Sequence, residues 1–544
     1  MSGQATTKTT RPLLSNGCNK VNKTSIECII TFFGGFMFIR SKIFRDTAIL
    51  SAMQLFLDSA ALLLNMFITR QLGSSAIGIL TLLGSFLGLA ATISNGNAFL
   101  CTSRLISEET GKKNGNPEKV LFHGIKLCII LSMAVSVFIL MLSDMICVRF
   151  FGGADMKSAL KAVPFVLITG AVGACLKGYF NAMRRTSVPA ISDVLEFAVK
   201  SAVIVAMTLA SKVHNDAFVC KLMITSIVIG NAVSFLYLIA VYIAKRTKYS
   251  GKCSLSFGKY ISYAFPILGG GVLTSFLSSA NDALIPFCLR QNGSTSAKAL
   301  GSFGVFEGIV LPALFFPSVV LCSLTGIIVS ETARAAAADN RERIKSLAER
   351  ITDDTLIFAV FAAAVLMRFG SNIGKLLGGG DEAGRLITLI APVVPFIYME
   401  IVLEAMIKGM GMQAFSSLNY LAEYAVRISV VLIFVPRFGL YGVAASYYTS
   451  NVFGNCSRFI KLLKASGMKF SLLSSVILPI LYAFMTMAGA EMLMKPFAAH
   501  AENVLFSVIY IMLWGAIYCG IMLFIGRLKR YGKISDRVVV NNYQ

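Results

Sequence analysis

The sequence predicts an all-α polytopic membrane protein with about 14 transmembrane helices, because long apolar runs follow one another along the chain. Of its 544 residues, 56% are hydrophobic and only 14% are charged, whereas about 25% of the residues in a soluble domain are charged. Basic residues are concentrated in the segments between the runs, and the second half of the chain resembles the first. Together these observations predict two six-helix lobes in a parallel repeat, followed by two C-terminal helices.

Each expected span is an apolar run of roughly 20 residues, the length that crosses the hydrocarbon core of a bilayer. The runs lie at 46–69, 77–101, 120–143, 159–181, 188–210, 217–243, 258–288, 300–329, 353–369, 384–407, 417–436, 440–460, 471–493 and 503–526.

The basic residues predict the orientation of the helices. The chain has a formal charge of +23, and its clearest basic loops are 244–259 and 331–351. Both loops lie on the same side as the termini when the spans are counted, so the positive-inside rule places both termini in the cytoplasm. The expected location is the bacterial cytoplasmic membrane, where anionic headgroups account for the basic charge without nucleic acid.

The spans and the loops divide the chain into five expected parts. The polar N-terminal tail contains a short apolar segment at 28–39, which is expected to lie at the interface, and translation starting at Met37 is an alternative. The parts are a cytoplasmic tail over 1–45, an N-lobe over 46–245, a C-lobe over 255–465, the last two spans over 466–530 and a cytoplasmic tail over 531–544.

Charged and turn residues recur between the two halves in the same order, at offsets of 220 to 231 positions. Six helices separate equivalent segments, so the two copies have the same orientation, which is the parallel repeat found in transporters. The matched positions are Arg70-Gln71 with Arg290-Gln291, Lys177-Gly178 with Lys408-Gly409, Glu196 with Glu423, and Lys200 with Arg427.

Several of these stretches resemble the multidrug/oligosaccharidyl-lipid/polysaccharide flippase superfamily, in particular its stage V sporulation protein B and polysaccharide-export branch. The resemblance covers most of the chain after residue 45. It is carried by Asn-Asp-Ala-Leu-Ile-Pro at 281–286, Gly-Ser-Phe-Gly at 301–304, Leu-Pro-Ala-Leu-Phe-Phe-Pro-Ser at 311–318, Thr-Ser-Arg-Leu-Ile-Ser-Glu-Glu at 102–109 and Lys-Gly-Tyr-Phe-Asn-Ala-Met at 177–183.

The resemblance implies a two-lobe transporter that flips polyprenyl-pyrophosphate-linked glycans. The first helix departs from the pattern of the peptidoglycan-precursor flippases, which typically carry arginines there. Here it has Asp58 and Asn65, with no basic residue between Arg45 and Arg70. An acidic helix suits a pyrophosphate poorly, which argues against lipid II itself as the cargo.

A charge near the bilayer centre costs about 2.5–3.5 kcal/mol on insertion scales, so each such residue needs a partner or a function. Opposite charges four residues apart on a helix predict neutralising pairs. The pairs are Glu196 with Lys200, Glu404 with Lys408, and Glu423 with Arg427. The candidates for the substrate or ion cavity are Asp58, Asn65, Asp193, Asp282, Arg290, Glu307 and Glu400, and the candidates for an inner gate or headgroup contact are Arg104 and Lys177.

The sequence therefore predicts a secondary transporter, not an enzyme, that flips a lipid-linked saccharide by alternating access. No phosphate-binding loop is present, so we expect no cofactor and a coupling ion that is H⁺ or Na⁺. The expected partners are the lipid-linked glycan and membrane lipids. The alternatives are a cation-coupled multidrug exporter of the same superfamily and a membrane glycan polymerase. Gly269-Gly270-Gly271 in the seventh span predicts either a bending point or close helix packing.

Overall fold

The computed structural model describes residues 42–110, 115–143, 161–211, 215–245, 255–496, 506–522 and 524. Over these residues the chain is helical and contains no strand. The chain divides into two compact units, one over Thr47–Tyr518 and the other made of Met1–Asp46 and Cys519–Gln544. The expected tails, the apolar segment 28–39, Met37 and most of the loop 244–259 lie outside the described residues.

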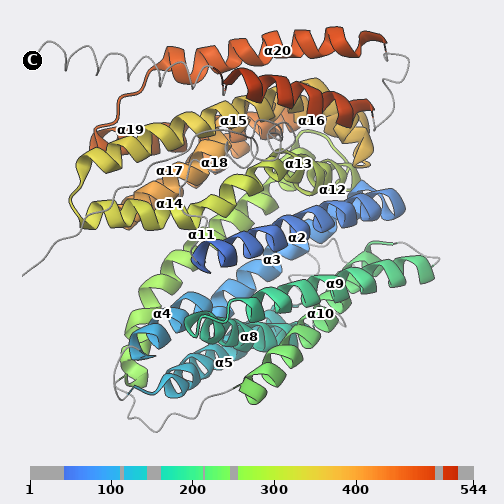
Figure 1. Ribbon diagram of the computed structural model, residues 1–544. Coiled ribbons are helices and arrows are strands. Elements are labelled where there is room, and N and C mark those ends of the chain that lie inside the picture. The colour runs from blue at the N-terminus through green and yellow to red at the C-terminus, as the bar shows by residue number, and fades with distance from the viewer. Residues whose placement is uncertain are drawn as a thin grey trace, which may run out of the picture. The chain divides into compact units, whose positions relative to one another are not determined.

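The helices of the first half follow the first six expected spans (Figure 1). They are α2 (Lys42–Leu72), α3 (Ser74–Asn95), α4 (Ala98–Thr110), α5 (Pro117–Met141), α8 (Val163–Ala182), α9 (Ser187–Ala210) and α10 (Asp216–Lys245).

The second half continues from α11, a long helix that packs against α3 of the first half and against α18 of the second (Figure 1). Its elements are α11 (Phe257–Gln291), α12 (Ser296–Val305), the π-turn η1 (Phe306–Val310), α13 (Leu311–Phe315), η2 (Phe316–Ser318), α14 (Val319–Ala337), α15 (Arg341–Leu376), α16 (Gly380–Ile390), η3 (Ala391–Val393), α17 (Val394–Gly409), α18 (Gln413–Phe438) and α19 (Leu440–Ser466). They are followed by η4 (Leu473–Ile477), α20 (Leu478–Met494) and a helix over Phe506–Met522.

Every expected span is matched by a helix, and eleven helical stretches of the described chain are long and apolar enough to cross a membrane. The other three expected spans fall on α9, α19 and Phe506–Met522. Helix α9 carries three charged side chains, α19 is rich in polar and basic residues, and Phe506–Met522 is short. The all-helical membrane fold is therefore confirmed, with a helix count that agrees broadly with 14.

Three of the expected spans are broken helices. The second span bends between α3 and α4 at Gly96 and Asn97, whose φ angles are 54° and 53°. The eighth is interrupted by the π-turn η1 and by the short turn η2, which contains Pro317. The tenth is interrupted at η3, which contains Pro392. Discontinuous helices in transporters line substrate and ion sites, because their unwound backbone leaves polar groups free.

The two halves contact each other closely where α3 packs against α12. A Cβ atom added to Gly78 would lie 2.0 Å from the carbonyl oxygen of Leu300, and one added to Gly304 would lie 2.4 Å from the nitrogen of Gly78. A third glycine, Gly308, lies against Ile77 in the same way. Small residues allow helix backbones to approach this closely in membranes. In the predicted topology these helix ends face outward.

Equivalent helices of the two halves pack in the same way, as a parallel repeat predicts. Helix α8 packs on α4, and α17 packs on α14. The glycine at the end of the first helix pair, Gly178, lies against the Phe99 carbonyl and Thr102; its counterpart Gly409 lies against the Val329 carbonyl and Thr332. The Lys-Gly pairs noted in the sequence thus occupy matching helix contacts.

Candidate functional site

The centre of the candidate site is Arg458 on α19, whose side chain is fully buried. Its guanidinium lies 3.3 Å from Glu400 and 3.3 Å from Glu404, both on α17. It also donates a hydrogen bond of 3.0 Å to Glu423 on α18. A buried guanidinium needs such partners, because the uncompensated charge costs several kcal/mol. Arg458 therefore connects three helices of the second half.

Two further cations complete the neutralisation of these carboxylates. Arg427 lies 3.2 Å from Glu423, donates to the Ser450 hydroxyl at 2.9 Å and stacks over the ring of Tyr447 at 4.5 Å. Lys408 lies 3.2 Å from Glu404. The three carboxylates around Arg458 are thus balanced by three basic side chains, and the cluster is close to neutral.

A cavity of about 370 Å³ opens beside this cluster. Aromatic and aliphatic side chains of α13, α17, α18 and α19 form its walls, together with charged groups of the cluster. Its lining residues are Leu311, Phe315, Ile397, Glu400, Ile401, Glu404, Tyr420, Glu423, Tyr424, Arg427, Tyr447 and Asn451. A mostly apolar cavity with a few converging polar groups is the usual form of a ligand site.

The π-turn η1 places Glu307 next to this cavity, where it accepts a hydrogen bond of 3.1 Å from the Tyr447 hydroxyl. Asn65 on α2 donates to the carbonyl of Gly308 in the same turn, at 2.9 Å. Asp282 on α11 accepts a hydrogen bond from Ser85 on α3. These bonds join helices of the first half to α11 and to the eighth span. A π-turn with a partly buried acid is a recurrent feature of functional sites.

The first half contains a smaller counterpart of the cluster. Lys177 on α8 lies 2.6 Å from Asp193 and 3.6 Å from Glu196, both on α9. A cavity of about 240 Å³ beside it is also lined by Asn231. A Cβ atom added to Gly230 would touch the backbone of Glu196. A Cβ atom added to Gly454 in the second half would collide with the side chain of Glu423. In both halves, a glycine therefore packs against the equivalent glutamate.

Comparison with curated proteins relates the chain to two sporulation proteins of Bacillus subtilis (strain 168). It is 19% identical over 396 residues to stage V sporulation protein B, covering 71% of this chain and 76% of that protein. It is 20% identical over 377 residues to sporulation protein YkvU, covering 68% of this chain and 82% of that protein. No protein-family model matches the chain.

Solved structures show the same fold. The lipid II flippase MurJ, in an inward closed conformation, aligns with a TM-score of 0.67 and 14% identity, covering 89% of this chain and 99% of that one. The MATE multidrug transporter DinF-BH aligns with a TM-score of 0.58 and 15% identity, covering 78% and 96%.

The two sporulation proteins are thus similar to the chain over 71% and 68% of its length. Its fold is the one that MurJ and the MATE transporters share.

Two of the three pairs expected along single helices are present. Glu404 lies beside Lys408 and Glu423 beside Arg427, as described above. The third differs, because Glu196 pairs with Lys177 of the neighbouring helix and no ion pair joins it to Lys200 within the described chain. Two acids on α9 therefore share one lysine from α8, and Asp193, expected to lack a partner on its own helix, is the nearer of the two.

The other expected cavity residues are spread over the molecule. Glu400, Glu307 and Asp282 lie at or near the cluster of the second half. Asp58 accepts a hydrogen bond of 2.9 Å from Gln54 on its own helix. The exposed cations are Arg104, which pairs with Glu108 at 3.1 Å, and Arg290, which stacks over Phe287. The charged residues thus form one buried cluster in the second half, one partly exposed cluster in the first half, and separate exposed positions.

The sequence analysis missed Arg458, the residue at the centre of the main cluster. The available signal was an arginine inside the expected span 440–460, together with two acids but one lysine on α17. Glu404 and Lys408 neutralise each other and leave Glu400 unmatched, so a further cation was needed. Its position on α19, two helices further along the chain, could not be derived from spacing within one helix.

Proposed function

We propose that this protein is a secondary transporter that flips a polyprenyl-pyrophosphate-linked saccharide across the membrane by alternating access. Sequence similarity to stage V sporulation protein B over 76% of that protein supports a transporter of this branch. The likeness to MurJ, which extends over 99% of that flippase, supports the two-lobe fold that the mechanism needs. The saccharide–phosphate headgroup passes between the lobes while the prenyl chain stays in the lipid.

The main support for the proposal is that basic side chains neutralise the acids beside the cavity at Arg458. A transporter for organic cations needs carboxylates that lack a counter-ion, because the cargo itself must supply the charge. Here Glu400, Glu404 and Glu423 are matched by Arg458, Arg427 and Lys408. The balanced cavity offers hydrogen-bond donors and aromatic surface, which suit a sugar better than a cationic drug.

The cargo phosphates need cations that are open to a ligand. The side chain of Arg104 is 65% exposed, and it pairs with Glu108, whose side chain is 51% exposed. Arg290, at the opposite end of the spans in the predicted topology, is also exposed. Exposed ion pairs contribute about 0–1 kcal/mol, so a pyrophosphate can replace the Glu108 contact at little cost. We therefore assign Arg104 and Arg290 to headgroup binding on the two sides.

Coupling to H⁺ is assigned to Glu307 and Asp282. Neither carboxylate forms an ion pair within 4 Å in the part of the chain that the structure describes, and each accepts a hydrogen bond from a hydroxyl. Both lie on bonds that join different helices, so loss of the carboxylate charge would change contacts between α11, α3 and the eighth span. Gain of a proton would thereby favour one of the two access states.

One observation favours the rival function, a cation-coupled multidrug exporter. Asp58 on α2 has a neutral partner, Gln54, and is only partly buried. An acid of this kind on the first helix could bind a cation or a cationic drug. Among the described residues it has no ion pair, in contrast to the acids of the two clusters.

The experiment that separates the two functions is native mass spectrometry of the purified full chain, titrated with a polyprenyl-pyrophosphate glycolipid or with ethidium. We expect saturable glycolipid binding that weakens about tenfold when Arg104→Gln removes a charge-assisted contact. The matched control is Arg437→Gln, an exposed arginine at the end of α18 that the proposal leaves out. Ethidium binding that requires Asp58, without glycolipid binding, would overturn the proposal.

A further inference from the structure

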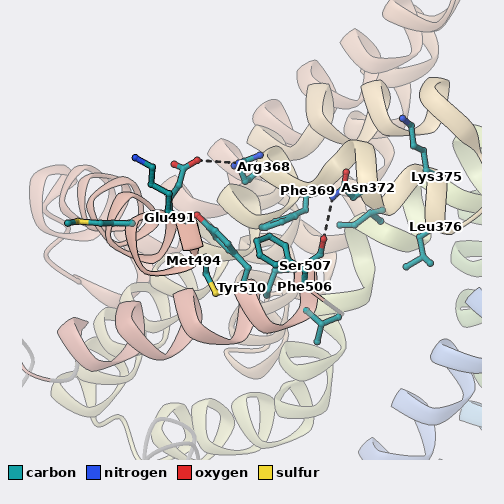
Figure 2. A pocket seen from close by; sticks show the side chains of 15 residues that line it. Arg368, Phe369, Asn372, Lys375, Leu376, Glu491, Met494, Phe506, Ser507 and Tyr510 are labelled. Carbon is teal, nitrogen blue, oxygen red and sulfur yellow. Dashed lines mark hydrogen bonds and ion pairs between the residues drawn. The ribbon is translucent and has the colours of Figure 1, made fainter. Parts of the chain in front are cut away.

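A further large cavity lies away from both clusters. It has a volume of about 1220 Å³ and opens between the C-terminal ends of α15 and α20 and the helix Phe506–Met522 (Figure 2). It shares no lining residue with the cavity beside Arg458. Typical small-ligand sites measure about 300–1,000 Å³, so this cavity has room for a large part of a lipid molecule.

The inner wall of the cavity is apolar and rigid. Phe369 and Tyr510 are almost completely buried, and their rings pack edge to face at 5.3 Å. Tyr510 also donates a hydrogen bond to the Met487 carbonyl at 3.2 Å. Met494 and Ile511 continue the wall. These side chains form an apolar surface for a hydrocarbon chain, and the Tyr510 hydroxyl already has its hydrogen-bond partner.

The rim of the cavity is basic. Arg368, Lys375 and Lys495 line it, with Glu491 as the acidic lining residue. Figure 2 shows Arg368 directed toward Glu491 at the mouth, and their ion pair is 3.5 Å long with both side chains about half exposed. Lys375 pairs outside the cavity with Asp381, again between exposed groups. Such pairs contribute about 0–1 kcal/mol, so the rim retains cations for an anionic ligand.

The last two helices depend on this region for their attachment. Helix α20 packs on α15, and the helix Phe506–Met522 joins the same apolar cluster through Tyr510 and Trp514, which face Phe369 and Phe361. A molecule in the cavity would contact all three helices at once. It would add apolar contacts between α15, α20 and the helix Phe506–Met522 at the end where the cavity separates them.

We infer that this cavity binds one anionic phospholipid, with its phosphate at Arg368 and Lys495 and an acyl chain on the wall formed by Phe369, Met494 and Ile511. The basic rim selects a negative headgroup, and the apolar wall accepts a hydrocarbon chain. Bilayer phospholipid is in great excess over any cargo, which favours it as the resident ligand. The site is independent of the proposed transport function.

Trp514 provides a direct readout, because it is the single tryptophan of the chain. It is fully buried, donates to the Thr486 hydroxyl at 3.0 Å and lies 6.3 Å from the Tyr510 ring that lines the cavity. The purified full chain in detergent would be titrated with phosphatidylglycerol or phosphatidylcholine brominated on the acyl chains. Bromine quenches tryptophan at short range, so we expect stronger, saturable quenching by phosphatidylglycerol.

The variant Arg368→Gln/Lys495→Gln keeps the size of the side chains and removes two charges. Each cation near a lipid headgroup contributes about 1 kcal/mol, so the apparent affinity for phosphatidylglycerol should fall roughly thirty-fold. The matched control is Lys298→Gln/Arg437→Gln, which removes two exposed charges elsewhere. Unchanged Trp514 emission without lipid shows that each variant keeps this junction folded.

Two results would overturn the inference. One is equal quenching by the two brominated lipids, or equal affinity in the charge variant and the control. The other is displacement of brominated phosphatidylglycerol by a trace of polyprenyl-pyrophosphate glycolipid but not by excess unlabelled phosphatidylglycerol. The second result would assign the cavity to cargo.

Discussion

At the scale of single residues, Arg458 determines whether the larger cluster can exist. Replacing it with leucine would leave Glu400, Glu404 and Glu423 facing one another with only Arg427 and Lys408 beside them. Breaking a buried ion pair costs about 3–5 kcal/mol. We expect Arg458→Leu to lower the thermal stability of the purified protein strongly, while Arg437→Leu at an exposed position leaves it nearly unchanged. Equal melting temperatures for the two variants would contradict this reading of the cluster.

The two equivalent lysines of the repeat should respond differently to substitution. Lys177→Met removes the cation that both Asp193 and Glu196 contact, whereas Glu404 keeps Arg458 after Lys408→Met. We expect the free energy of unfolding to fall by about 1 kcal/mol for Lys177→Met, because its partners are partly exposed, and by less for Lys408→Met. Thermal unfolding of both variants in the same detergent measures the difference, and the reverse order would contradict the account.

At the scale of helices, the contact between α3 and α12 depends on glycine. In Gly78→Val the new Cβ atom would occupy the space of the Leu300 carbonyl, so these helix ends could not close. Gly88→Val on the same helix has open space around its Cβ and is the matched control. We expect Gly78→Val to abolish transport and Gly88→Val to retain it. Normal transport by Gly78→Val would show that this contact does not form during the cycle.

The glycines of α11 distinguish bending from close packing. Cβ atoms added to Gly269 or Gly270 meet no atom within 4 Å, so tight packing does not require these glycines. Alanine in a helix is more favourable than glycine by about 1 kcal/mol. We expect Gly269→Ala/Gly270→Ala to raise the melting temperature but slow transport, because α11 becomes stiffer. Gly489→Ala on α20 controls for helix propensity alone, and an unchanged transport rate would exclude a bend at this position.

The sequence predicted the helices more fully than the site, for a physical reason. Apolar length and loop charge are local properties, so each expected span is matched by a helix and the repeat by matching contacts at Gly178 and Gly409. Spacing of four along one helix correctly indicated Glu404 with Lys408 and Glu423 with Arg427. The other ion pairs join different helices, so spacing along one helix does not predict them. Lys177 pairs with α9, and Arg458 pairs with α17 and α18.

At the scale of the whole molecule, contacts between the halves combine with an ion-paired cluster inside each half. The α3–α12 contact closes one end, and α11 packs against helices of both halves. The ion-paired cluster within each half can move as a unit, because no charge has to leave its partners during the change. Such rigid-body motion of two repeats around a central site is the basis of alternating access. Of the proposed H⁺ sites, Asp282 bonds to Ser85 of the first half, whereas Glu307 bonds to Tyr447 within the second half.

The coupling proposal predicts a response to the pH gradient. Glu307→Gln keeps a hydrogen-bond acceptor for the Tyr447 hydroxyl but cannot exchange a proton at physiological pH. We expect this variant to bind glycolipid normally but to lose acceleration by an imposed pH gradient across vesicles. Tyr447→Phe is the companion variant, because it removes the partner and keeps the carboxylate. Equal acceleration in Glu307→Gln and the unsubstituted protein would assign coupling elsewhere.

The most direct test of the central claim is a flipping assay with the full chain reconstituted in vesicles. A polyprenyl-pyrophosphate glycolipid is placed in one leaflet, and its arrival in the other is followed with a lectin that cannot cross the membrane. The account predicts flipping well above that of protein-free vesicles, lost in Gly78→Val and retained in Gly88→Val. Absence of glycolipid flipping, together with ethidium uptake that requires Asp58, would contradict it and identify a drug exporter.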